Sequence, residues 1–173
     1  MNSRAYYSSS IHDFLTMDAE NILGSILIHN EFETTDLQKN SWREEIHILQ
    51  QELKSYGRGE VIFEYTIPRM GHRVDVVCLI NGIIFLLEFK VGDKQYTKSA
   101  ADQVMDYALD LKYFHEKSKE RYIIPIVVST EDATRENQVN FMRDNISGII
   151  YCNKANIGEN ISRILQKIVS EPF

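Results

Sequence analysis

The sequence of 173 residues contains only two cysteines, Cys78 and Cys152, which lie far apart. Such distant cysteines exclude a disulfide framework and a cysteine zinc site, and both suit small buried side chains in a reducing cytoplasm. The sequence also lacks the apolar run of about 18 residues that a membrane-spanning helix requires. Its first residues show no charged and then apolar signal pattern. These absences predict a cytoplasmic protein without a membrane partner.

An excess of positive charge is absent as well. Lys and Arg number 19 against 25 Asp and Glu, which gives a formal net charge of −6. Bulk attraction alone therefore does not hold nucleic acid on this protein. An acidic metal site that acts on nucleic acid is still compatible with this charge, because bound cations change the local field. Apolar residues make up 43% of the chain, and this length suits one domain with a core of moderate size.

The order of periodic segments predicts a single α/β domain with a mixed sheet flanked by helices. Residues 1–40 are expected to form an N-terminal helical extension, residues 41–130 an αβββαβ core, and residues 131–173 a C-terminal αβα addition. Ser41 is the expected cap of the first core helix, with Glu44 at the capping-box position. The other expected segments are strands 61–67, 72–80, 83–90, 122–128 and 148–151 and helices 99–117, 137–143 and 157–169.

Two carboxylates fall within the most apolar part of the sequence. Asn81 and Gly82 predict a two-residue hairpin turn, since both readily take positive φ angles. Counting outward from this turn places Asp75 directly opposite Glu88, with Cβ atoms about 4.5–5.5 Å apart. Two buried carboxylates at that distance repel each other and lose hydration, so a positive charge is expected between them.

A divalent cation can supply that charge, because carboxylate oxygens are ligands suited to Mg²⁺ or Mn²⁺. Lys90 lies two residues after Glu88 and is expected on the same face of the sheet, where its ammonium can hold a water and offset charge on a phosphate. Structural salt bridges are the alternative, either between Asp75 and Lys90 or between Glu88 and Arg73.

The αβββαβ order with Asp75 and then Glu88-Phe89-Lys90 resembles the PD-(D/E)XK nuclease superfamily, whose core has the fold of restriction endonucleases. The usual Pro-Asp pair appears here as Val74-Asp75. The resemblance implies a metal-dependent phosphodiesterase in which Asp75, Glu88 and the Phe89 carbonyl bind Mg²⁺ or Mn²⁺. It also implies that Lys90 orients the attacking water.

The helix expected after this motif contains Gln103-x-x-x-Tyr107, which resembles the motif of the RecB-like branch of the superfamily. The two residues are one helical turn apart, so both can face the hairpin. The resemblance implies that they support Lys90 or the scissile phosphate. Taken without the hairpin motif, they would be ordinary residues of a helix surface.

The superfamily often adds an acid from the helix before the sheet. Glu45 lies about 40° outside the apolar stripe of that helix, whereas Glu44 points almost opposite to it. We therefore favour Glu45 as a further ligand of the metal or of water, with a rim salt bridge as its alternative.

The similarity extends over nearly the whole chain. The stretches "IPRMGHRVDVVCLINGIIFLLEFKVG" and "YYSSSIHDFL" resemble the N-terminal nuclease domain of prokaryotic nuclease–helicase proteins, where it precedes a Schlafen-like superfamily 1 ATPase. A helicase or ATPase, on the same chain or as a partner, is therefore expected. This sequence itself has no G-x-x-x-x-G-K-[ST] phosphate-binding loop.

These observations predict a metal-dependent nuclease that hydrolyses phosphodiester bonds of nucleic acid, with DNA favoured over RNA. Two alternatives stay open. The domain could be a catalytically inactive nuclease fold that binds DNA or assembles with a helicase, because fold does not guarantee activity. It could also be a ribonuclease. The sequence does not separate an endonuclease from an exonuclease.

Overall fold

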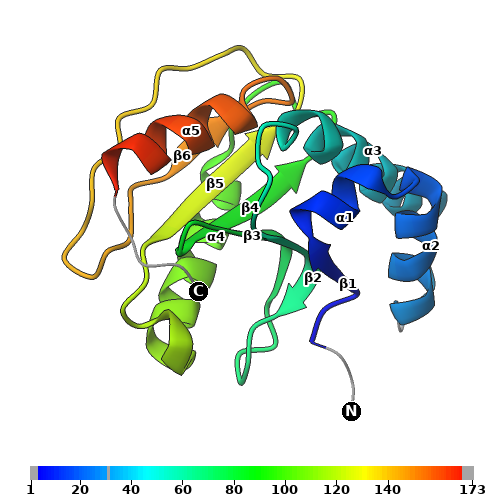
Figure 1. Ribbon diagram of the computed structural model, residues 1–173, viewed down its shortest axis with the longest axis horizontal. Coiled ribbons are helices and arrows are strands. Elements are labelled where there is room, and N and C mark those ends of the chain that lie inside the picture. The colour runs from blue at the N-terminus through cyan, green and yellow to red at the C-terminus, as the bar shows by residue number, and fades with distance from the viewer. Residues whose placement is uncertain (1–3, 31, 169–173) are drawn as a thin grey trace.

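The computed structural model of the protein describes residues 4–30 and 32–168. Within these ranges, six strands form one sheet in the order β1-β2-β3-β4-β5-β6 (Figure 1). Strands β1 to β4 are antiparallel neighbours, and β4, β5 and β6 run parallel. The prediction of a mixed α/β sheet is therefore confirmed. The strands are β1 (Tyr7–Ser10), β2 (Glu60–Thr66), β3 (Arg73–Ile80), β4 (Ile83–Lys90), β5 (Ile123–Ser129) and β6 (Ile150–Cys152).

The predicted core order of helix, three strands, helix and strand is present as α3 (Asp36–Glu52), β2, β3, β4, α4 (Lys98–Phe114) and β5. A short turn joins β3 to β4, as antiparallel strands allow. The parallel pairing of β4 with β5 needs a crossover connection, and α4 supplies it. In the described ranges, no helix has the length and apolar character needed to cross a membrane.

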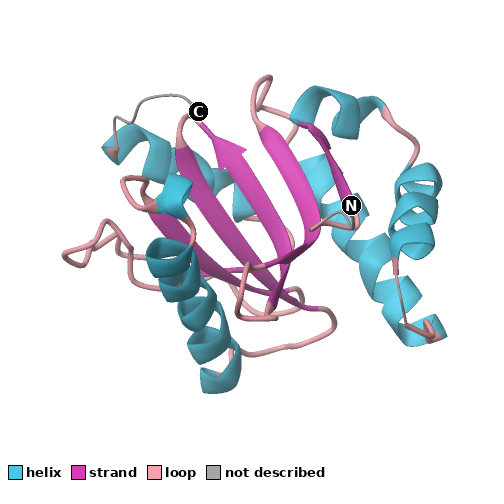
Figure 2. Cartoon of the chain, turned by 90° about the horizontal axis from the view of Figure 1, so that it is seen from below, coloured by secondary structure: helices cyan, strands magenta, loops and turns pink. Residues whose placement is uncertain are grey.

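Helices cover both faces of the sheet (Figure 2). On one face, α4 packs on apolar side chains of β3, β4 and β5, among them Val77, Leu86 and Val127. The opposite face carries Phe63, Val76 and Phe85, which are packed beneath α1, α2, α3 and α5. The alternation of side chains along each strand thus gives two apolar layers with the sheet between them.

The N-terminal part differs from the prediction in two respects. Residues 1–40 were expected to be helical, but they include the edge strand β1, followed by α1 (Ile11–Thr16) and α2 (Ala19–His29). Helix α3 begins at Asp36, not after Ser41, because the hydroxyl of Thr35 accepts a hydrogen bond from the Gln38 N–H at 3.1 Å. Thr35 thus supplies the cap that the prediction assigned to Ser41.

The C-terminal addition also differs, since residues 131–149, all of them described, contain no helix. The prediction of a helix over residues 137–143 is wrong, because the Asn137 side chain takes the place of a neighbouring strand beside β6. Its amide donates to the Tyr151 carbonyl at 2.8 Å, and its oxygen accepts from the Tyr151 N–H at 2.8 Å. Only β6 and α5 (Ile157–Lys167) remain of the expected αβα unit, and position 169 of the expected last helix lies outside the described residues.

Candidate functional site

The β3–β4 hairpin has the register that the turn predicts. Asn81 and Gly82 have φ angles of 49° and 77°, as a type I′ turn requires. The paired residues of β3 and β4 run from Ile80 and Ile83 to Val76 and Leu87. Continued by one residue, the same register places Asp75 opposite Glu88. There the Asp75 carboxylate accepts a hydrogen bond from the backbone N–H of Phe89 at 2.8 Å.

Lys90 forms an ion pair with the acid two residues before it. Its ammonium donates to the Glu88 carboxylate at 2.9 Å. The alternative salt bridges, from Asp75 to Lys90 and from Glu88 to Arg73, are not the pairs that form. The Lys90 side chain is 32% exposed while Glu88 is buried. The ammonium therefore lies between a buried carboxylate and solvent, where a ligand can reach it.

Glu45 approaches the same two acids from α3. It is buried, and its Oε2 has no hydrogen-bond partner among the described residues. Burial, followed by the charges of Asp75, Glu64 and Glu88, raises the pKa of Glu45 well above its usual range. Glu45 therefore lies near the hairpin acids and not in a rim salt bridge, and its role as a ligand of the metal or of water stays a prediction.

Glu64 on β2 is a fourth member of this group, and the sequence analysis missed it. The ladder between β2 and β3 places it opposite Asp75. Its φ angle of 54° is unusual for a strand residue. Glu64 accepts hydrogen bonds from the Trp42 indole at 2.8 Å and from the Arg73 guanidinium at 2.8 Å. An acid within the apolar strand "EVIFEYT" was the signal that could have revealed it.

We call Glu45, Glu64, Asp75 and Glu88 the acid cluster. Burial raises the pKa of Asp75 well above its usual range, and the charges of Glu88 and Glu64 add to this effect. Only two basic side chains pair with the cluster in the described part of the chain, Arg73 and Lys90. If all four acids ionise, two negative charges are therefore left uncompensated. A buried site of this kind either binds protons or attracts cations.

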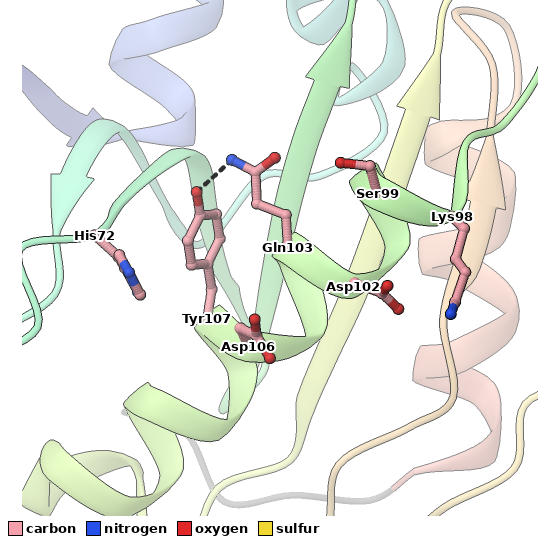
Figure 3. A pocket seen from close by; sticks show the side chains of 7 residues that line it. All are labelled: His72, Lys98, Ser99, Asp102, Gln103, Asp106 and Tyr107. Carbon is pink, nitrogen blue, oxygen red and sulfur yellow. Dashed lines mark hydrogen bonds between the residues drawn. The ribbon is translucent and has the colours of Figure 1, made fainter.

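Helix α4 places two polar residues beside the acid cluster. The side-chain amide of Gln103 donates to the Tyr107 hydroxyl at 2.5 Å (Figure 3). Both residues line an open pocket with a volume of about 600 Å³, and His72 lies at its side with its ring centroid 5.7 Å from that of Tyr107. Burial raises the pKa of Tyr107, and the Glu88 charge contributes. The motif expected on this helix therefore faces the hairpin.

The carboxylates of the acid cluster are the donors available to the metal that the sequence implies. Over residues 4–30 and 32–168, no group of three or more His, Cys, Asp or Glu side chains is arranged to hold a metal ion. Two buried carboxylate oxygens, on Glu45 and Glu88, nevertheless have no partner among these residues. Unpartnered buried oxygens with excess negative charge fit Mg²⁺ or Mn²⁺ by donor type.

The Phe89 carbonyl was the one backbone ligand predicted. The N–H and C=O of a residue in an antiparallel strand point to the same side. The Phe89 N–H bonds to Asp75 on β3, so its carbonyl also faces the β3 side.

No family model matches this sequence, and no curated protein matches it either.

Proposed function

We propose that this protein is a metal-dependent nuclease that hydrolyses phosphodiester bonds, with DNA favoured as the substrate. One observation carries the proposal: the acid cluster, three of whose four members are buried, is in excess over its basic partners and lies beside a lysine whose ammonium reaches solvent. A structural salt-bridge network has no need for unpartnered carboxylate oxygens, because each such oxygen lowers stability.

Lys90 acts as a donor in this proposal. Burial alone would lower the pKa of Lys90, but its hydrogen bond to Glu88 and the charges of Glu88 and Asp75 raise it overall. The ammonium thus stays protonated at neutral pH and does not serve as a base. It can hold a water molecule and stabilise negative charge on the phosphate. Glu88 fixes the position of the ammonium through their 2.9 Å contact.

Gln103 and Tyr107 form the wall of the site on the α4 side. Their mutual hydrogen bond orients both side chains, so their remaining polar atoms can bind a phosphate oxygen or the Lys90 ammonium. Asp75, Glu88, Glu45 and the Phe89 carbonyl would hold Mg²⁺ or Mn²⁺. Such a cation supplies Lewis-acid stabilisation of charge on the phosphate.

The test is cleavage of end-labelled single- and double-stranded DNA and RNA, with Mg²⁺, with Mn²⁺ or with EDTA. We expect cleavage that requires the metal and is lost in Lys90→Ala. Lys54→Ala is the matched control, because Lys54 is an exposed lysine after the end of α3 that donates to the Gln51 side chain. The four substrates also separate deoxyribonuclease from ribonuclease activity.

Two results would overturn the proposal. Cleavage that survives unchanged in Lys90→Ala would remove Lys90 from the mechanism and point to a contaminating enzyme. Absence of cleavage on all four substrates by folded protein would favour a nuclease fold that only binds nucleic acid or a partner.

A further inference from the structure

A second cavity lies on the other flank of α4, outside the acid cluster. Its volume is about 530 Å³, within the range of small-molecule sites. The segment between Lys90 and α4 contributes Tyr96, and β6 contributes Tyr151. Met105 and Ile149 add apolar surface, while Lys98 adds a positive charge. Neither tyrosine ring belongs to the proposed catalytic machinery.

Two aromatic rings and a guanidinium group are packed together in this cavity. The ring centroids of Tyr96 and Tyr151 are 4.6 Å apart, and the two rings are tilted by 53°. The Arg135 guanidinium carbon lies 4.2 Å from the centroid of the Tyr96 ring. Arg135 is half-exposed and pairs with Asp132 at 3.4 Å. A flat ligand that enters the cavity therefore meets an aromatic ring and a planar cation.

The surrounding protein fixes the positions of Tyr96 and Tyr151. The Tyr96 hydroxyl is fully buried, so its ring cannot swing freely into solvent. The backbone of Tyr151 is fixed by the two hydrogen bonds with the Asn137 side chain. A prearranged aromatic surface reduces the entropy lost when a ring binds to it.

The cavity adjoins the candidate active site. Lys98 and Asp102 line both this cavity and the pocket of Gln103 and Tyr107. Figure 3 shows Lys98 and Asp102 on the opposite flank of α4 from Gln103 and Tyr107. A chain that crosses the N-terminal part of α4 can therefore occupy both hollows at once, with its phosphates passing the Lys98 ammonium.

We propose that the cavity of Tyr96, Tyr151 and Arg135 binds an unpaired nucleobase of single-stranded nucleic acid. The proposal rests on the proposed nuclease function and deepens it, since it names the class of substrate. Bases stack on tyrosine rings and on guanidinium planes in single-strand recognition, whereas a paired base inside a duplex offers no free face. The substrate thus has a single-stranded segment beside the bond that is cleaved.

The experiment measures binding without cleavage, in EDTA. A fluorescein-labelled single strand of about 12 nucleotides is titrated with protein, and its anisotropy is recorded. DNA and RNA strands are compared, together with a DNA strand of equal length whose residues are abasic. The abasic strand keeps every phosphate and lacks the bases, so it separates stacking from charge attraction.

We expect the wild type to bind intact strands about tenfold or more tightly than the abasic strand. Tyr151→Leu and Arg135→Lys should each lose most of this difference. Tyr151→Leu keeps an apolar side chain but removes the aromatic ring. Arg135→Lys keeps the positive charge but removes the planar guanidinium. Tyr113→Leu is the control, since this exposed tyrosine lies near the C-terminal end of α4.

Equal affinity for intact and abasic strands, or no binding of either, would overturn the proposal. Unchanged binding in folded Arg135→Lys and Tyr151→Leu would do the same. Failure of the nuclease proposal is distinguishable, because it would leave base-dependent binding in EDTA without any cleavage in Mg²⁺. Conversely, cleavage with an unchanged KM in Tyr151→Leu would support the nuclease proposal and contradict the proposal of a base-binding cavity.

Discussion

Asn137 fixes the outer edge of the sheet, so its removal should destabilise the fold by an amount that the structure allows us to work out. Two of its hydrogen bonds, each 2.8 Å long, replace the strand partner of Tyr151, and a third reaches Asn160 at 3.1 Å. A neutral hydrogen bond contributes about 1 kcal/mol. Asn137 is only half-buried, so water compensates in part. Asn137→Ala should therefore lower the free energy of unfolding by about 2 kcal/mol.

Thermal and urea unfolding measure this change. For a chain of this length, about 2 kcal/mol corresponds to a fall in Tm of roughly 4–8 °C. Asn140→Ala is the control, because the Asn140 side chain is exposed, and it should stay within about 0.5 kcal/mol of the wild type. Because Asn137 holds Tyr151, binding of single strands should weaken as well. An Asn137→Ala variant as stable as the control would refute the role of this side chain as a strand substitute.

Three further predictions concern charge, packing and the site. Burial is the main cause that raises the pKa of Glu45 in the folded protein. The protonated Glu45 side chain therefore contributes its full stability below the pKa of an unfolded glutamate, and this contribution is lost as pH rises through the folded-state pKa. Glu45→Gln should therefore exceed the wild type in Tm at about pH 8 in EDTA and lose this advantage toward about pH 5; an advantage that grows with acidity would contradict the reasoning. Gly158→Ala should destabilise by about 1–3 kcal/mol in urea unfolding, because its Cβ would lie 2.4 Å from the Glu52 carbonyl oxygen. Gly24→Ala, with open space around it in α2, should stabilise by about 0.5–1 kcal/mol; equal effects would show that the contact at position 158 relaxes. Tyr107→Phe loses the contact with Gln103 and should slow cleavage less than Lys90→Ala does, while Tm stays close to that of the wild type; a rate equal to that of the wild type would remove Tyr107 from the site.

The hairpin could be predicted from the sequence because its information is local. The Asn-Gly dipeptide specifies the turn, and the turn specifies the register of every residue on both strands. The opposition of Asp75 and Glu88 follows from that register alone. The ion pair chosen by Lys90 did not follow, because several acids lie within its reach and only the three-dimensional arrangement selects Glu88.

The features that were missed depend on distant parts of the chain. Glu64 belongs to the acid cluster through contacts with Trp42 and Arg73, and its positive φ angle has no signal in the alternation of β2. Asn137 bonds to a strand 14 residues later, so polar residues there suggested a helix that the tertiary hydrogen bonds replace. Local periodicity cannot report such contacts.

The most direct test of the central claim is calorimetric titration of the metal-free protein with Mn²⁺. We expect saturable binding to the wild type and to Asp106→Asn, whose carboxylate is exposed in the pocket beside α4. Asp75→Asn and Glu88→Gln should bind at least about tenfold more weakly, since each removes a carboxylate ligand. Identical isotherms for all four proteins would contradict the account, because the acid cluster would then have no role as a cation site.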